Sequence, residues 1–176
     1  MTAHAPPTPS SGETESPAVA AAEARAVAPL LVSSLETMAG SRLFTVPTVA
    51  LLVEVAARLS GAQISLVVVC DAAGVVVGII TETILVRRLG LGQADFFTTH
   101  ASDVMTKDFT TCTPQELLSD VLATMHARGL IHVVLIGADN KPTGVLNARD
   151  GLRALLAAGN YEEKLLRNYV MGIGYQ

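Results

Sequence analysis

The chain has 176 residues, of which half are hydrophobic, 16% are charged and only 4% are aromatic, so it is long enough and apolar enough to fold around an aliphatic core. The formal net charge is −4 and no basic stripe stands out, which argues against nucleic-acid binding. The longest charge-free apolar stretches, 59–70 and 72–81, are both too short to span a membrane.

The first 28 residues are rich in Ala, Pro and Ser, and we expect them to form a disordered tail. Beyond them the hydrophobic pattern predicts a unit of strand, helix, strand, strand and helix. Its parts are a strand at 43–46, a helix opened by Pro47 and Thr48, a strand at 64–70, a strand ending at 78–80 and a helix at 82–89.

The same pattern returns 66 residues later, when Gly78 is set on Gly144 (144 − 78) and no gap is introduced. The second unit has a strand at 109–112, a helix opened by Thr113 and Pro114, a strand at 130–136, a strand ending at 144–146 and a helix at 148–158. Thr113 suits the N-cap of its helix, and Pro114 suits the first helical position. One such unit is too small to bury its own sheet face, whereas two packed together can do so.

The sequence therefore predicts an α/β (α+β) fold built from two β-α-β-β-α repeats, followed by a C-terminal helix. The expected divisions are a tail, a first repeat, a linker, a second repeat, and a closing helix with its tail. Their bounds are 1–28, 29–90, 91–104, 105–158 and 159–176.

Two segments of the second unit, "DVMTKDFTTCTPQELLSDVLATM" and "IHVVLIGADNKPTGVLNARDGL", resemble the second member of a tandem pair of cystathionine β-synthase (CBS) domains. The second segment contains a sequence similar to the family's Gly-x-x-(Thr/Ser)-x-x-Asp motif, and "GIITETI" at 78–84 is its counterpart in the first unit. The resemblance covers about residues 35–158. The closing "EEKLLRNYVMGIGYQ" is similar to the ends of small stand-alone bacterial members.

The resemblance implies a module in which the repeats pack sheet to sheet with pseudo-twofold symmetry and leave clefts between them. Such modules commonly bind adenosyl compounds (AMP, ADP, ATP, NAD(H) or S-adenosylmethionine) and commonly pair as homodimers through their helices. It implies a non-catalytic regulatory role with no required cofactor, no bound metal and no membrane insertion. The two cysteines lack a CxxC spacing, which agrees with a reduced, cytoplasmic setting.

In the family's motif the Asp holds the ribose hydroxyls and the Thr or Ser contacts ribose or phosphate. These roles fall on Asp150 and Asn147 in the second repeat and on Thr81 in the first, while Arg149 would pair with a phosphate. Gly144 would let the backbone approach the ligand. On position alone Asp150 is better explained as a helix cap, and only the repeat pattern favours the ribose role.

The resemblance extends the ligand site to three further places. Thr111, Cys112 and Thr113 lie where the family's first strand meets adenine, His132 lies where an imidazole can face phosphate, and Arg88 would reach phosphates across a dimer. Each has a plainer interpretation: His132 as a structural hydrogen-bonding group and Arg88 as part of a solvated helix face. Nothing near Cys112 in the sequence indicates the lowered pKa of a redox switch.

Neither copy of the motif is complete, because Ile84 stands at the carboxylate position of the first repeat and Asn147 replaces Thr or Ser in the second. A single ligand centred on Asp150 is therefore expected, and the alternative is a ligand-free structural or adaptor protein that acts through protein contacts. The chain has no nucleophile elbow, HExxH or P-loop motif, so we expect no catalysis.

Overall fold

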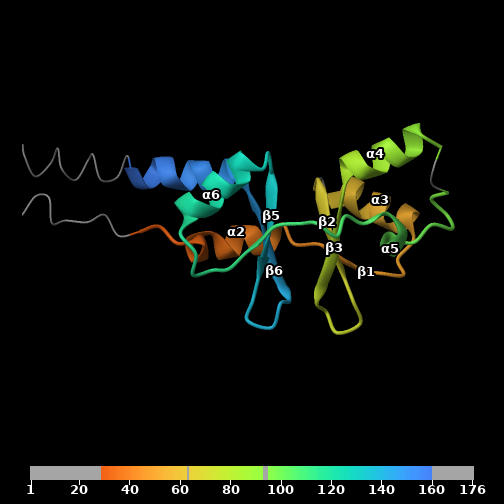
Figure 1. Ribbon diagram of the computed structural model, residues 1–176, viewed down its shortest axis with the longest axis horizontal. Coiled ribbons are helices and arrows are strands. Elements are labelled where there is room, and N and C mark those ends of the chain that lie inside the picture. Colours follow the sequence, from red (N-terminus) through yellow and green to blue (C-terminus); the bar gives the residue numbers. More distant parts are fainter. Residues whose placement is uncertain (1–28, 63, 93–94, 160–176) are drawn as a thin grey trace, which may run out of the picture.

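Two small α/β halves stand side by side in the computed structural model, which describes residues 29–62, 64–92 and 95–159 (Figure 1). The first half contains β1 (Thr45–Pro47), α3 (Leu52–Ala62), β2 (Leu66–Cys70), β3 (Val76–Thr81) and α4 (Glu82–Gly90). The second contains β4 (Thr111–Cys112), α6 (Leu118–Ala127), β5 (His132–Ile136), β6 (Pro142–Asn147) and a helix described over residues 148–159. Short helical segments precede each half: η1 (Val32–Leu35) with α2 (Glu36–Ser41), and α5 (Ala101–Val104).

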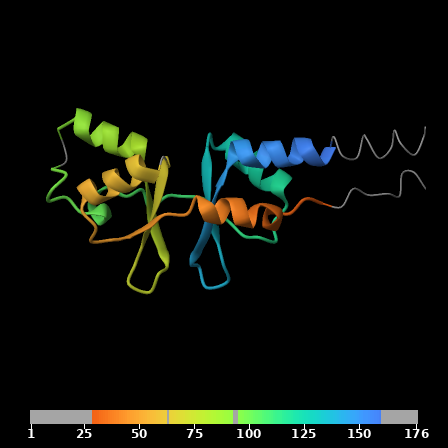
Figure 2. The ribbon, with the colours of Figure 1, turned by 180° about the vertical axis from the view of Figure 1, so that it is seen from behind.

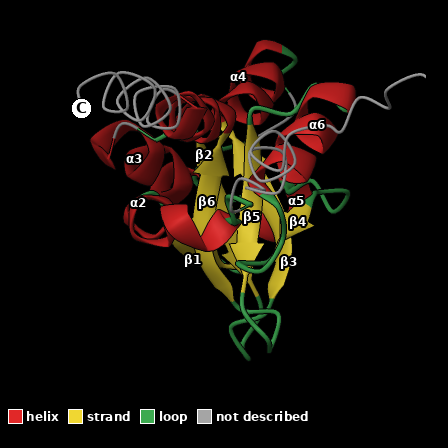
Figure 3. Cartoon of the chain, turned by 90° about the vertical axis from the view of Figure 1, so that its left-hand side faces the viewer, coloured by secondary structure: helices red, strands yellow, loops and turns green. Residues whose placement is uncertain are grey.

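Each half is built on a three-stranded sheet, in the order β1-β2-β3 and β4-β5-β6. In both sheets the first pair of strands is parallel and the second pair is antiparallel. The two sheets face one another, with helices on their outer sides (Figures 1 and 3). This arrangement confirms the predicted fold of two packed repeats.

The 66-residue repeat is confirmed in the detailed strand register. Val69 pairs with Gly78 in the first sheet and Leu135 with Gly144 in the second, and both sheets have an irregularity one residue later. The hairpin turns also correspond, since Gly74 and its counterpart Asn140 both have positive φ, 80° and 58°. Asn is one of the few residues that adopts this conformation readily, so the second turn manages without glycine.

Both central helices begin later than the sequence predicts: α3 at Leu52 and α6 at Leu118, rather than at Pro47 and Thr113. The proposed N-cap Thr113 instead bonds through its N–H to the Glu116 carboxylate, at 2.8 Å, in a local turn. The first amides of the helices are satisfied by distant backbone carbonyls. The Leu52 N–H donates to Thr99 O at 3.0 Å, and the Leu118 N–H donates to Leu30 O at 2.9 Å.

The chain crosses between the halves, so a repeat in sequence is not a unit in space. Helix α2 precedes the first sheet but packs on β6 of the second (Figure 2), whereas α5 packs on β3 of the first. Gly144 serves this packing, and it is not among the residues that line the cavity described below, so its expected approach to a ligand stays a prediction. A Cβ at Gly144 would lie 2.7 Å from the Cβ of Ala39 in α2.

The core has three parts that follow from this layout. Each half has its own cluster between sheet and helices, centred on residues such as Val55 and Ile80 in the first and Leu118 and Leu146 in the second. A third cluster lies between the two sheets and includes the fully buried Val68. Such runs of buried aliphatic residues are what a sheet covered on both faces requires.

Several sequence-based expectations concern residues outside the described part of the chain. These are the disordered tail over 1–28 and the closing helix and tail beyond residue 159. Within the described ranges, no helix combines the length and the apolar character needed to traverse a bilayer.

Candidate functional site

A cavity of about 660 Å³ lies between the halves, at the edge of the sheets opposite the hairpin turns. Both halves contribute to its wall through equivalent segments: the ends of β3 and β6 and the residues that begin β2 and β5. Thr81 and Asn147 line it from matching positions, as do Thr83 and Arg149. Segments related by the pseudo-twofold symmetry of the repeats therefore line the cavity from both sides.

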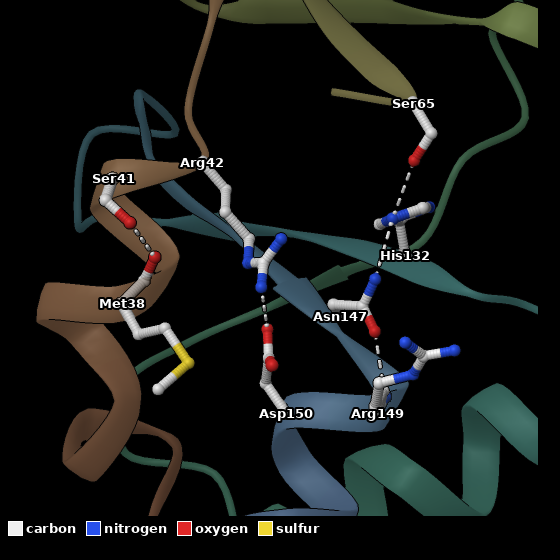
Figure 4. Close-up of polar contacts among 8 residues, drawn as sticks. All are labelled: Met38, Ser41, Arg42, Ser65, His132, Asn147, Arg149 and Asp150. Atoms are coloured by element: carbon white, nitrogen blue, oxygen red, sulfur yellow. Dashed lines mark hydrogen bonds and ion pairs between the residues drawn. The ribbon is translucent and has the colours of Figure 1, made fainter. Parts of the chain in front are cut away.

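Asp150 is the buried acid of this cavity, with 7% of its surface exposed. Its Oδ2 lies 2.7 Å from Nη2 of Arg42, which reaches it from the connection between α2 and β1 (Figure 4). The contact is an ion pair without hydrogen-bond geometry. Neither Asp150 Oδ2 nor the buried Arg42 Nε has a hydrogen-bond partner among the described residues.

A second polar group of the wall is formed by Ser65, His132 and Asn147. The amide of Asn147 is oriented by its Oδ1, which accepts from the backbone N–H of Arg149 at 2.8 Å. Its Nδ2 therefore faces His132 Nε2, at 3.1 Å, and the Ser65 hydroxyl lies 3.1 Å from the same nitrogen. With Asn147 donating, Nε2 is an acceptor and the imidazole is neutral.

The surroundings of His132 favour this neutral form. Burial lowers the pKa of His132, the positive charge of Arg42 lowers it further, and the negative charge of Asp150 opposes both. His132 is thus a neutral hydrogen-bonding group that links Ser65 of the first half to Asn147 of the second.

The structure brings five of the nine predicted site residues to the cavity wall. They are Thr81, His132, Asn147, Arg149 and Asp150. Thr81 also caps α4, accepting from the Ile84 N–H at 3.4 Å. Asn147 has the comparable place ahead of the helix at 148–159. The capping alternative proposed for Asp150 therefore belongs to Asn147.

The other four predicted residues, Thr111, Cys112, Thr113 and Arg88, are not among those that line the cavity. Thr111 is exposed, Cys112 is 1% exposed in the core of the second half, and Arg88 lies in the last turn of α4. Burial, with a smaller effect of the Glu116 charge, raises the pKa of the Cys112 thiol to about 12. Their assignment to a ligand site stays a prediction.

Sequence reasoning missed Arg42 and Ser65 as site residues. Arg42 stands 66 residues before Asp108, so the repeat alignment places an acid at its counterpart and gives no signal. Ser65 likewise aligns with the apolar Ile131. Only the three-dimensional structure identifies Arg42 as a site residue, because its contact with Asp150 depends on the packing of α2 on β6 of the second sheet.

Comparison with known proteins identifies the architecture. The family model of the CBS domain matches the chain twice, over residues 35–91 and 101–157. The chain belongs to the CBS-domain family. The two matches form the tandem pair that the internal repeat indicated, and proteins with such CBS pairs are generally regulatory rather than catalytic.

Solved structures agree with this assignment. A CBS-domain protein from Agrobacterium tumefaciens is 28% identical with a TM-score of 0.62, over 70% of this chain and 92% of that one. The CBS pair of protein MJ0100, in complex with 5′-methylthioadenosine and S-adenosyl-L-methionine, is 20% identical with a TM-score of 0.62, over 72% and 99%. The cytosolic domain of the Mg²⁺ channel MgtE, in complex with ATP, is 17% identical with a TM-score of 0.56, over 65% and 45%.

Proposed function

We propose that this CBS pair is a non-catalytic regulatory module that binds one adenosyl compound in the cavity between its repeats. The observation that carries the proposal is Asp150, a buried carboxylate on the cavity wall whose Oδ2 has no hydrogen-bond partner among the described residues. A ribose diol offers two O–H donors to such a carboxylate, and hydrogen bonds to an ionised acceptor are the stronger kind.

The size and polarity of the cavity support this ligand class. Its volume of about 660 Å³ lies within the range of roughly 300–1,000 Å³ that is typical of small-molecule sites. Apolar side chains such as Leu66, Ile79 and Leu130 share the wall with the polar groups, which suits a molecule with a flat base and a polar sugar. That MJ0100 and MgtE bind adenosyl compounds in the same fold is consistent with this choice.

Thermal unfolding with AMP, ADP, ATP, NAD, NADH and S-adenosylmethionine tests the proposal, with guanosine nucleotides for comparison. A ligand at a hundred times its Kd stabilises the folded state by about 2.7 kcal/mol. For a chain of this size the melting temperature is expected to rise by roughly 5–10 °C. The rise is expected for at least one adenosyl compound and is to be lost in Asp150→Ala.

Asp120→Ala is the matched control for Asp150→Ala. Asp120 is the third residue of α6, as Asp150 is the third residue of the helix at 148–159, but it is exposed and away from the cavity. The control is expected to keep the full ligand response. Equal loss in both variants would point to a general effect of removing a helix carboxylate rather than to a ligand contact.

A ligand-free adaptor is the second candidate function, and a specific observation favours it. Arg42 already neutralises Asp150, and Ile84 leaves the first repeat without a carboxylate at the matching place. Under this alternative no adenosyl compound shifts the melting temperature of the wild-type protein or of any cavity variant.

We also propose that the module works as a homodimer that pairs through the last helix of each repeat, α4 and the helix at 148–159. Both α4 and the helix at 148–159 carry exposed large apolar side chains. The two helices lie at the edge of the molecule opposite the hairpin turns (Figure 1). Association would bury these side chains and remove apolar surface from water.

A further inference from the structure

The ion pair between Arg42 and Asp150 joins two parts of the chain that belong to different repeats. Arg42 is the C-cap residue of α2, which precedes the first sheet, and Asp150 follows the last strand of the second. The pair is held by tight packing behind it, since a Cβ at Gly144 would lie 2.8 Å from the carbonyl carbon of Ala39. The backbone that carries Arg42 is thus fixed beside the cavity, while its side chain is 43% exposed.

The pair is poorly satisfied for groups so placed. The Asp150 side chain is 8% exposed and the Arg42 side chain 43% exposed, yet Asp150 Oδ2 and Arg42 Nε lack hydrogen-bond partners within the described ranges. A buried charge pair offsets its desolvation only when hydrogen bonds complete it. Each group is therefore open to exchange for a partner with better geometry.

We propose that Arg42 is an internal competitor for the ligand. In the ligand-free protein it holds Asp150; when a ribose diol takes the carboxylate, Arg42 transfers to an anionic group of the same ligand. This inference rests on the proposed function and adds a selectivity rule to it. A neutral nucleoside satisfies Asp150 but leaves a guanidinium without its anion, whereas a nucleotide satisfies both.

The ion pair between Arg42 and Asp150 has no equivalent at the matching positions of the other repeat. The counterpart of Arg42 is Asp108, and the counterpart of Asp150 is Ile84. Asp108 instead lies 3.4 Å from Arg128 in an exposed ion pair. The exchange therefore predicts one ligand per chain, held in one orientation, although the cavity wall is built from equivalent segments of both repeats.

Arg149 is the other cation of the wall, and it provides a matched control. Its side chain makes no ion pair with the acids of the described part of the chain, and the residue is exposed. If Arg149 binds a phosphate, its loss weakens nucleotide binding but leaves adenosine binding unchanged. Only the loss of a competitor strengthens adenosine binding, so the sign of that change separates the two roles.

Calorimetric titration with adenosine and with AMP tests the exchange in wild type, Arg42→Gln and Arg149→Gln. The wild-type protein is expected to prefer AMP by about tenfold or more, which corresponds to about 1.4 kcal/mol. In Arg42→Gln, adenosine is expected to bind more tightly than to wild type, and the preference for AMP is expected to fall toward one. In Arg149→Gln, adenosine binding stays at the wild-type value. Equal or weaker adenosine binding in Arg42→Gln overturns the inference.

Arg42→Lys guards against misfolding, because it keeps a cation beside the Asp150 carboxylate, which Arg42→Gln does not. The preference for AMP over adenosine should be kept more fully in Arg42→Lys than in Arg42→Gln; equal preferences in the two variants contradict the exchange. If wild type binds AMP but no adenosine, and Arg42→Gln binds both, Arg42 excludes the neutral ligand and the inference stands. If neither protein binds any adenosyl compound, the proposed function itself fails.

Discussion

His132 shows how the fold sets the charge of a single side chain. Its Nε2 faces Nδ2 of Asn147 and the hydroxyl of Ser65, both at 3.1 Å, and burial and Arg42 lower its pKa. Protonation at Nε2 would turn an acceptor into a donor that faces the Asn147 amide donor. The folded protein therefore resists protonation of this ring more than the unfolded chain does.

Lowering the pH through the ordinary pKa of histidine, about 6.5, is expected to destabilise the wild-type protein. The unfolded chain takes up a proton at His132 first, so this residue's contribution is complete above about pH 6.5 and is lost as the pH falls toward the lower folded-state pKa. Denaturant midpoints at about pH 8 and pH 5.5 should therefore differ more in wild type than in His132→Gln. The exposed His126 supplies the control variant, His126→Gln, which should keep the wild-type dependence. The same pH dependence in His132→Gln would rule out this cause.

The residues of the site were predictable only where the repeat marks them. Asp150, Asn147 and Thr81 occupy fixed places in a motif that occurs twice, so the sequence alone draws attention to them. Arg42 has no such place, and its contact with Asp150 arises from chain crossing. Strand register was predictable for the opposite reason: two equal apolar patterns place Gly78 and Gly144 alike.

At the scale of elements, helix ends were the least predictable feature. Thr113 and Pro114 form a favourable local start, but α6 begins at Leu118 because Leu30 supplies a carbonyl to its first amide. A distant backbone group thus replaces the side-chain cap that local sequence suggests. The same contact brings the segment before the first sheet against the second half.

Gly144→Ala is expected to destabilise the protein by about 1–3 kcal/mol, as overpacking of a close contact does. The new Cβ would meet the backbone of α2, at 2.8 Å from the Ala39 carbonyl carbon and 3.0 Å from the Gly40 nitrogen. Gly78→Ala should cost less, since its nearest atom is the flexible Met105 Sδ, at 2.6 Å. Chemical denaturation measures both.

Gly61→Ala is the matched control for these glycine substitutions. Gly61 lies in α3, and a methyl group added there would have no neighbouring atom within 4 Å, so alanine should stabilise the helix by about 0.5–1 kcal/mol. If Gly144→Ala matches Gly61→Ala in stability, α2 is not packed on β6 as the structure has it.

At the scale of the whole molecule, a nearly symmetric scaffold carries an asymmetric site. Sheet register, hairpin turns and the cavity wall repeat, but the ion pair at its edge occurs in one half only. The symmetric features depend on backbone geometry and apolar packing, which tolerate many sequences. The asymmetric ones depend on single charged residues, which a duplicated fold is free to change in one copy.

The symmetry also places apolar side chains on the last helix of each repeat, α4 and the helix at 148–159. Val86 on α4 and its counterpart Leu152 are 69% and 54% exposed, and Leu89 and Leu156 extend the same two helices with 64% and 68%. Single exposed apolar residues are common on protein surfaces, but equivalent ones on two helices at one edge favour a pairing surface.

The double variant Val86→Glu/Leu152→Glu is therefore expected to convert a homodimer into a monomer. Sedimentation or light scattering should give wild type twice the mass of one chain, and the variant the mass of one chain at the same concentration. Two buried carboxylates per chain should weaken association by tenfold or more, which corresponds to a loss of about 1.4 kcal/mol or more. Val49→Glu introduces the same charge at an exposed apolar residue ahead of α3 and should leave the dimer intact. A wild-type protein that stays monomeric at high concentration, or a variant that stays dimeric, would show that these helices do not form the interface.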